Sequence, residues 1–254
     1  MTRLPRLIRI AITPRSATLK TRTPNGAIVV GRNRPGHGGR GLFLERDSLE
    51  PEIALIPQLL PVDGVFVDVG ASTGVYSMTA AQHLRGSGTV VAVEPTLEIL
   101  GMLERAVELN GFHNVRLRNL CLAARTGARV IWHNFGRPNQ FSLVRRDEEA
   151  EADSVLAVAL DDLMRWEGLT RLDFVKIDVE GSESEVLEGA SESIGRYLPV
   201  IQVEDIIERV RLVPTGYLSM VLPGSPNHLL VHSEDQRVGV LRKAGARLVG
   251  NQGE

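Results

Sequence analysis

The feature that most constrains this chain is an apolar run that ends in an acid and passes directly into a glycine-containing turn. Residues 65–69 are VFVDV, residues 70–74 are GASTG, and a stretch suited to a helix follows. A short run rich in β-branched residues predicts a buried strand, and glycine permits the sharp bend into the helix. This unit is typical of the first strand, turn and helix of a ligand-binding α/β sheet.

The rest of the chain repeats this alternation of apolar strands and helices. Strands are predicted at 89–93, 115–122, 128–133, 155–160, 172–177 and 200–203, with a final pair at 217–222 and 229–232. Residues 137–153 are polar and have no period, which predicts a long loop that could cover a substrate. We therefore expect an α/β, Rossmann-like fold, with a mostly parallel seven-stranded sheet and helices on both faces.

Composition limits the partners of the chain. The 254 residues suffice for one large domain, the net charge is -2, and the single Cys121 excludes an internal disulfide framework. Cys121, Trp132 and Trp166 lie in apolar contexts and are predicted to pack in the core. No apolar run approaches the ~20 residues that a membrane-spanning helix needs. A cytoplasmic protein without a nucleic-acid partner is expected.

The beginning of the chain has a different charge from the remainder. Residues 1–44 contain nine Lys and Arg residues and no Asp or Glu, and they are predicted to form a basic N-terminal extension with a short strand and a glycine-rich loop. Residues 45–254 are predicted to form the main domain. One interpretation of the extension is a solvated basic arm. A second is an organelle presequence, because such segments are basic and poor in acids. A third is peripheral contact with an anionic membrane surface, near a lipid-linked substrate.

Two elements predict a cofactor that contains a nucleoside. Gly70 and Gly74 shape the turn after the first strand, where Asp68 can bind an amino group or organise the loop. Glu94 ends the next strand, where a carboxylate accepts hydrogen bonds from ribose hydroxyls. A site for a dinucleotide pyrophosphate usually has a further glycine between Gly70 and Gly74, but Ser72 occupies that position. The spacing thus favours S-adenosylmethionine over a nicotinamide cofactor.

A third element follows the strand at 172–177. Asp178 and Glu180 are expected at the carboxyl edge of the sheet, near the place where a transferable methyl group would be presented. A sugar hydroxyl is a poor nucleophile until its proton is removed or its oxygen is bound by a metal ion. Asp178 and Glu180 are therefore candidate catalytic residues. His113 and His133 are alternative bases, although each is more typical of a surface or packing position.

The same edge offers a magnesium site. Asp178 ends one strand and Glu204 and Asp205 end the next, so their carboxylates could bind Mg²⁺ together with waters and substrate oxygens. The competing interpretation of Glu204 and Asp205 is solvated acid at the start of a helix.

Together these elements resemble the FkbM family of S-adenosylmethionine-dependent methyltransferases. The matching segments are VFVDVGASTGVYS at 65–77, VAVEP at 91–95, NVRLRNLCLA at 114–123 and FVKIDVEGSESEVLEG at 174–189. The resemblance covers roughly residues 40–232, and KIDVEG is its most specific part. It implies a class I methyltransferase fold and O-methylation of a hydroxyl on a sugar, glycan or other natural product.

The resemblance also implies the residues that hold the cofactor. They are Asp68, Gly70, Ala71, Ser72, Gly74, Glu94, Asn119, Leu120 and Asp178, with Asn119 and Leu120 near the adenine. The Asn-Pro-Pro-Tyr type motif of amino-group methyltransferases that act on nucleic acids is absent, and DVEG stands in its place. This difference disfavours a nucleic-acid base as substrate.

Two alternatives from other functional classes stay open at this stage. One is a nicotinamide-dependent oxidoreductase, and the other is a methyltransferase-like fold kept as a non-catalytic binding subunit. The expected partner is a small-molecule or saccharide acceptor, free or lipid-linked, and a homo-oligomer is compatible with the sequence.

Overall fold

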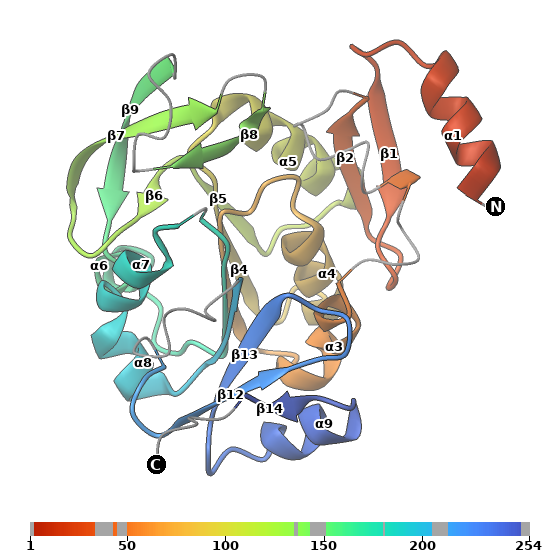
Figure 1. Ribbon diagram of the computed structural model, residues 1–254. Helices are drawn as coiled ribbons and strands as arrows, with labels where there is room; N and C mark the ends of the chain where they lie inside the picture. Colours follow the sequence, from red (N-terminus) through yellow and green to blue (C-terminus); the bar gives the residue numbers. More distant parts are fainter. Residues whose placement is uncertain are drawn as a thin grey trace.

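The computed structural model of the chain is organised around an eight-stranded mixed sheet with helices on both faces (Figure 1). It describes residues 3–33, 43–44, 50–134, 137–142, 151–179, 181–204 and 213–249. The strand order in the large sheet is β14-β12-β13-β11-β10-β3-β4-β5.

Five of these strands are parallel, and three antiparallel strands extend the sheet at one side. The parallel strands are β3 (Val65–Val69), β4 (Thr89–Val93), β5 (Val115–Arg118), β10 (Phe174–Ile177) and β11 (Val200–Glu204). The antiparallel ones are β13 (Asn227–His232), β12 (Tyr217–Val221) and β14 (Arg247–Leu248). The expected α/β class is confirmed, but the expected count of seven strands is wrong. The eighth, β14, has two residues, which is too short to give a periodic signal.

The order of the strands creates a crevice at one edge of the sheet. From β3 the chain proceeds outward to β4 and β5, whereas β10 lies on the other side of β3 and leads outward to β11. Connections that leave neighbouring strands in opposite directions open a ligand-binding crevice beyond their carboxyl ends. In this sheet the crevice is expected beyond β3 and β10.

Apolar side chains of the large sheet point alternately to its two faces, and helices cover both faces. One face of the sheet packs against α6 (Leu160–Trp166), α7 (Glu183–Glu188) and α8 (Ser191–Tyr197). The other face packs against α3 (Glu52–Leu59), α4 (Val75–Leu84), α5 (Leu97–Asn110) and α9 (Arg237–Lys243). On this second face the rings of Phe66 and Phe174, both fully buried, stack with centroids 5.1 Å apart.

A second sheet forms where the sequence predicts a loop. It has the order β6-β9-β7-β8, from β6 (Cys121–Leu122), β9 (Glu151–Val158), β7 (Gly127–Asn134) and β8 (Arg137–Ser142). The predicted loop at 137–153 is therefore wrong where β8 and the start of β9 lie. Antiparallel pairing with β7 satisfies the backbone there, and sequence periodicity does not report such pairing when the side chains are polar.

The N-terminal segment forms α1 (Arg3–Ile12) and a hairpin of β1 (Thr18–Arg22) and β2 (Ile28–Arg32) (Figure 1). The hairpin does not extend freely into solvent, because Val29 and Val30 are buried in a cluster with Leu103 of α5. The division of the chain at residue 44 stays a prediction.

Two of the three core predictions can be compared with the structure. Cys121 is buried, as expected, but Trp166 at the end of α6 is 57% exposed, so its predicted core position is wrong. Trp132 belongs to β7, and its side chain lies outside the described residues. Within the described part of the chain, no helix is both long enough and apolar enough to cross a bilayer.

The stacked phenylalanine pair gives a test of the core. Phe174→Ala removes a ring from a close-packed site, and we expect the free energy of unfolding to fall by roughly 3–5 kcal/mol. The exposed Trp166 is the matched control, because Trp166→Ala is expected to cost no more than about 0.5 kcal/mol. Urea denaturation of the two variants measures both values, and similar losses would contradict the assignment of the core.

Candidate functional site

The turn after β3 is fixed by contacts with two neighbouring strands. Gly70 and Ala71 donate their backbone N–H groups to the carbonyl oxygen of Val93 at the end of β4, at 3.0 and 2.9 Å. Gly70 has a φ of +74°, and a Cβ atom there would lie 2.0 Å from the carbonyl oxygen of Asp178. The absence of a side chain at Gly70 thus lets the turn pass against the backbone that follows β10.

Gly74 has a different role in the same turn. Its φ is +77°, and a Cβ atom there would lie 2.0 Å from Cδ1 of Leu103 in α5. The close contact is between the start of α4 and α5.

Glu94 directly follows β4 and is held by the backbone around it. Its Oε2 accepts a hydrogen bond of 3.0 Å from the N–H of Ser72, and its Oε1 accepts one of 2.9 Å from the N–H of Thr96. Burial raises the pKa of Glu94 to about 7, although these two N–H groups oppose the rise. Asn119 donates from Nδ2 to the carbonyl oxygens of Glu94 and Pro95, at 3.1 and 2.7 Å. Asn119 therefore supports the segment that carries this carboxyl group.

Three buried polar residues form a row across the centre of the sheet. Asp68 of β3, Lys176 of β10 and Gln202 of β11 are register partners, and each is at most 5% exposed. They point to the face covered by α4, where the neighbouring positions on each strand are apolar. A charged row in such a layer requires internal partners, because an unpaired buried charge is costly.

Lys176 provides these partners and joins the parts of the site. Its Nζ donates 3.0 Å hydrogen bonds to the carbonyl oxygen of Gly70 and to Oδ2 of Asp178, and it lies 3.8 Å from Oδ1 of Asp68. Burial acts to lower the pKa of Lys176, but the carboxylates of Asp178 and Asp68 outweigh burial, so the pKa is raised. The ammonium group therefore stays charged and holds the turn and both acids in place.

Asp68 is occupied by the start of α4. Its Oδ2 accepts hydrogen bonds from the backbone N–H and from Oγ of Ser77, at 3.0 and 2.5 Å. Burial raises the pKa of Asp68, against the effect of Lys176. Of the two roles expected from the sequence, these contacts favour organising the loop. Its buried Oδ1 has no hydrogen-bond partner among the residues that the structure describes.

Asp178 differs from Asp68 because its side chain is 39% exposed. Burial acts to raise its pKa, but Lys176 and a side-chain hydrogen bond with Glu204 lower it overall. The carboxyl groups of Asp178 and Glu204 therefore face each other at the ends of β10 and β11. Two carboxyl groups that share a hydrogen bond favour a state in which one holds a proton or a cation lies between them.

The two other acidic residues expected at this edge, Glu180 and Asp205, lie outside the described residues. Within the described part of the chain, no group of three His, Cys, Asp or Glu side chains is arranged to hold a metal ion. His113 precedes β5 and so lies at the amino edge of the sheet, away from Asp178. The side chain of His133 is outside the described residues.

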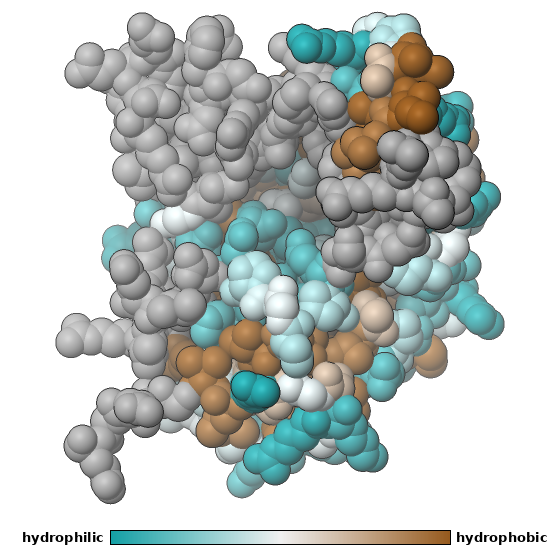
Figure 2. Space-filling view, turned by 45° about the vertical axis from the view of Figure 1, so that its right-hand side comes forward, coloured by the Kyte–Doolittle hydropathy of each residue, from teal (hydrophilic) through white to brown (hydrophobic). Residues whose placement is uncertain are grey.

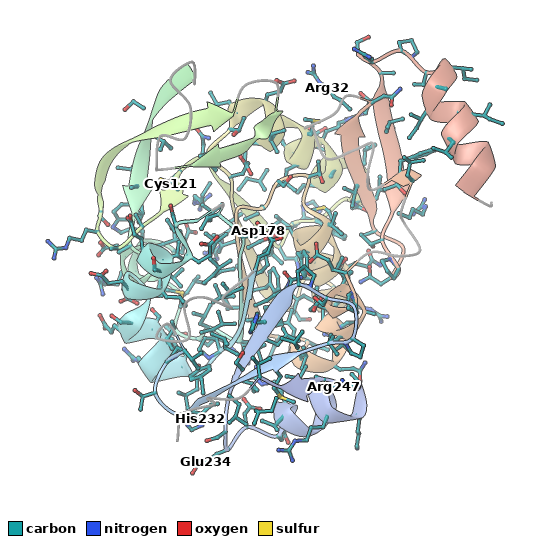
Figure 3. The ribbon with its side chains drawn as sticks, viewed as in Figure 1. Arg32, Cys121, Asp178, His232, Glu234 and Arg247 are labelled. Carbon is teal, nitrogen blue, oxygen red and sulfur yellow. The ribbon has the colours of Figure 1, made fainter. Side chains whose placement is uncertain are left out.

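A mainly apolar pocket lies beside the turn. It is lined by Val69, Gly70, Val93, Pro95, Cys121, Leu122, Val179 and Ser182, residues that end or follow β3, β4 and β10 or belong to β6. Leu120 is buried but is not among these lining residues. Cys121 and Asp178 lie in the same part of the molecule, whereas His232, Glu234 and Arg247 lie at its far end (Figure 3).

Sequence reasoning missed a polar network on the other side of Lys176. Gln202 donates from Nε2 to the hydroxyl oxygen of Tyr76 at 2.6 Å, and that hydroxyl donates to Oε2 of Glu50 at 2.5 Å. Asn227 of β13 donates to the same Glu50 oxygen at 2.8 Å. The available signal was a polar residue inside an apolar strand, Lys176 in FVKI and Gln202 in VIQV.

The residues present fit S-adenosylmethionine. Glu94 provides a carboxyl group at the end of β4, where ribose hydroxyls are bound in such sheets. The apolar walls beside it suit a purine ring, and the sharp turn at Gly70 carries no side chain into the crevice. No phosphate-binding run of glycines is present in the turn, since Ser72 stands between Gly70 and Gly74.

Comparison with known proteins shows the family of the chain. The sequence matches a family model described as the methyltransferase FkbM domain over residues 68–216. No curated protein sequence gives a significant match. Among solved structures, the chain is similar to methyltransferase FkbM from Methylobacillus flagellatus KT, with 17% identity and a TM-score of 0.49. The alignment covers 90% of this chain and 58% of that one, so this chain spans little more than half the length of that protein.

Two further solved structures show similarity over a smaller part of this chain. An O-methyltransferase from Bacillus cereus in complex with SAH aligns with 12% identity and a TM-score of 0.43, over 70% of this chain and 76% of that one. An rRNA methylase from Streptococcus thermophilus aligns with 13% identity and a TM-score of 0.42, over 70% and 91%. At these values neither structure carries information about the molecule on which this chain acts.

The close approach at Gly70 can be tested by substitution. Gly70→Ala combines a left-handed φ with a backbone clash, and we expect a loss of roughly 2–4 kcal/mol in the free energy of unfolding. Gly86 has a φ of +85°, but a Cβ atom added there would meet no other part of the chain within 4 Å. Gly86→Ala therefore measures the cost of the left-handed backbone conformation alone, which we expect to be about 1 kcal/mol. Equal losses in urea denaturation would show that the contact with Asp178 is unimportant.

The raised pKa of Glu94 predicts how stability depends on pH. The folded protein holds the Glu94 proton up to about pH 7, whereas the unfolded chain releases it near 4.5. The stability that this proton contributes is full below pH 4.5 and is lost as the pH rises through 7, by roughly 3 kcal/mol at most. Subtracting the stability curve of Glu94→Gln from that of the wild type should give this decline. A difference that is flat between pH 4.5 and 7, or rises, contradicts the burial of an ionisable Glu94.

Proposed function

The chain belongs to the FkbM methyltransferase family, and from this premise we propose that it is an O-methyltransferase that acts on a hydroxyl of a small molecule or saccharide. Membership of this family supports an S-adenosylmethionine-dependent methyltransferase and disfavours the nicotinamide cofactor. The observation that supports the hydroxyl acceptor is the pair of carboxyl groups of Asp178 and Glu204 at the ends of β10 and β11.

Separate parts of the crevice serve the two substrates in this proposal. S-adenosylmethionine supplies an activated methyl group when bound. Glu94 accepts hydrogen bonds from its ribose, and the apolar residues around Val93 and Leu122 exclude water from its nucleoside. Holding two reactants in a fixed orientation accounts for a large part of the barrier reduction in a displacement of this type.

In this proposal the carboxyl groups of Asp178 and Glu204 remove the proton of the acceptor hydroxyl. A hydroxyl becomes a competent nucleophile as its proton leaves, and a carboxylate within hydrogen-bonding distance can take that proton. Asp178 alone is a weak base, because Lys176 lowers its pKa. A second carboxyl group facing it increases the affinity of the pair for a proton. We therefore assign proton removal to the Asp178–Glu204 pair, with Glu180 as a further candidate that the described geometry does not reach.

Magnesium is the alternative use of the same two residues. Mg²⁺ is commonly bound by one or two carboxylates together with waters and substrate oxygens. Asp178 and Glu204 meet that requirement, and Asp205 is the third candidate ligand. A bound cation would lower the pKa of the acceptor hydroxyl in place of a protein base.

The acceptor class follows from the family and from charge. We propose a sugar, glycan or other natural product, free or lipid-linked, and no nucleic acid, because the whole chain carries a net charge of -2. A cytoplasmic location and a homo-oligomer are carried as parts of the same proposal.

The methyltransferase activity of the Asp178→Asn variant tests the role of the Asp178–Glu204 pair. We expect the rate of methyl transfer at saturating S-adenosylmethionine to fall roughly 100-fold or more, a larger factor than the loss of S-adenosylhomocysteine affinity that calorimetry measures on the same variant. Mass spectrometry would detect products that gain one CH2 group from a panel of nucleotide sugars, lipid-linked glycans and cell extracts. Glu234→Gln is the control, because Glu234 is exposed at the far end of the molecule (Figure 3).

The outcomes separate the parts of the proposal. Methylation at nitrogen or carbon contradicts the hydroxyl acceptor, and full activity of Asp178→Asn contradicts the assigned base. Loss of activity after EDTA treatment, with recovery on adding Mg²⁺, would replace proton removal by the metal. A protein that does not bind S-adenosylhomocysteine would be a non-catalytic subunit.

A further inference from the structure

Helix α1 presents an apolar face to solvent. Leu7, Ile8 and Ile12 are 43%, 56% and 76% exposed, and the interval of four residues between Ile8 and Ile12 places them one turn apart on one side. Ile10 lies on the opposite side, where it is 3% exposed and packs with Leu19 and Phe43. Among the α1 residues whose burial is described, Ile10 is thus the buried one, and the side of the helix that carries Ile8 and Ile12 is left uncovered.

This orientation is unusual for a helix of a globular protein. An amphipathic helix normally turns its apolar stripe toward the core and its charged side toward water. In α1 the guanidinium of Arg9 lies over the ring of Phe43 at 5.5 Å, so this basic side chain contacts the protein. Figure 2 shows brown, apolar side chains gathered over α1 with hydrophilic ones beside them.

The charge of residues 1–44 indicates which kind of surface would bind the apolar face of α1. Nine Lys and Arg residues and no Asp or Glu occur in residues 1–44, although the whole chain has 31 acidic and 29 basic residues. Arg15, Lys20 and Arg22 are exposed close to α1 in the sequence. Each cation near an anionic lipid surface contributes about 1 kcal/mol of attraction. Exposed Leu and Ile side chains on a short helix flanked by cations match the interface of an anionic bilayer.

We propose that α1 binds this protein peripherally to anionic phospholipid membranes, with Leu7, Ile8 and Ile12 inserted among the acyl chains. The neighbouring basic residues contact the lipid phosphates. A second copy of the chain is disfavoured as the occupant, because two such segments would bring two sets of cations together.

Contacts of α1 connect this surface to the cofactor edge of the sheet. Asn33 donates from Nδ2 to the carbonyl oxygens of Ile10 and Thr13, at 2.8 and 2.7 Å, which fixes the end of α1. Its neighbour Arg32, labelled in Figure 3, forms an ion pair of 2.9 Å with Glu98 in the first turn of α5. Glu98 lies four residues after Glu94. A membrane-bound enzyme would therefore take its acceptor near the bilayer, a consequence that rests on the proposed function, whereas membrane binding itself does not.

Vesicle flotation with the full chain tests the proposal. We expect the wild type to float with phosphatidylcholine vesicles that contain about 30 mol% phosphatidylglycerol, to float far less with pure phosphatidylcholine, and to be released by high salt. The double substitution Ile8→Asp with Ile12→Asp should reduce the bound fraction roughly tenfold or more. S-adenosylhomocysteine affinity of the same variant should be unchanged, which separates this test from that of the proposed function.

The matched control places the same charges at other exposed apolar positions. Val62 and Leu248 are 63% and 55% exposed and lie outside the basic segment, so Val62→Asp with Leu248→Asp should float like the wild type. Absence of flotation by the wild type, or equal loss in both double variants, overturns the proposal. A dimer in sedimentation that the α1 variant alone dissociates, without lipid binding, would assign the face to a second copy instead.

Discussion

The buried ammonium group of Lys176 is the contact on which the arrangement of the site depends. It lies in an apolar layer, at the centre of a row in which Asp68 and Gln202 are its register partners. A charge in that position is tolerated only with close counter-charges and hydrogen bonds. Those partners are Asp68, Asp178 and the carbonyl oxygen of Gly70, which belong to three different parts of the site. One interaction thus sets the path of the turn and the ionisation of an acid at the edge of the crevice.

The two acids that border the crevice consequently have different properties. Within the described part of the chain no cation makes a hydrogen bond with Glu94, and burial raises its pKa to about 7. Asp178 contacts Lys176 directly, and its pKa is lowered. Neighbouring carboxyl groups with opposite shifts are typical of sites in which one group binds and another handles a proton. The strand order produces this difference, since β10 lies beside β3 on the side away from β4.

Much of the site was predictable because its residues end apolar strands. Gly70, Glu94 and Asp178 stand at such ends, and the structure brings all three to one edge of the sheet. Lys176 and Gln202 were not found, because their importance depends on strand order and register, which periodicity does not contain. The second sheet was missed for a similar reason, since β8 is stabilised by backbone pairing with β7 rather than by an apolar pattern. Trp166 was placed in the core by its apolar neighbours, although it lies in the last turn of α6 and points outward.

The central claim is that the edge between Glu94, Gly70 and Asp178 encloses the nucleoside and sulfur of the cofactor. A crystal structure of the protein grown with S-adenosylhomocysteine measures this directly. We expect ribose hydroxyls within hydrogen-bonding distance of the Glu94 carboxylate, and the ligand sulfur on the side of the crevice that carries Asp178. A ligand bound elsewhere, or a ribose that leaves Glu94 bonded only to Ser72 and Thr96, would contradict it.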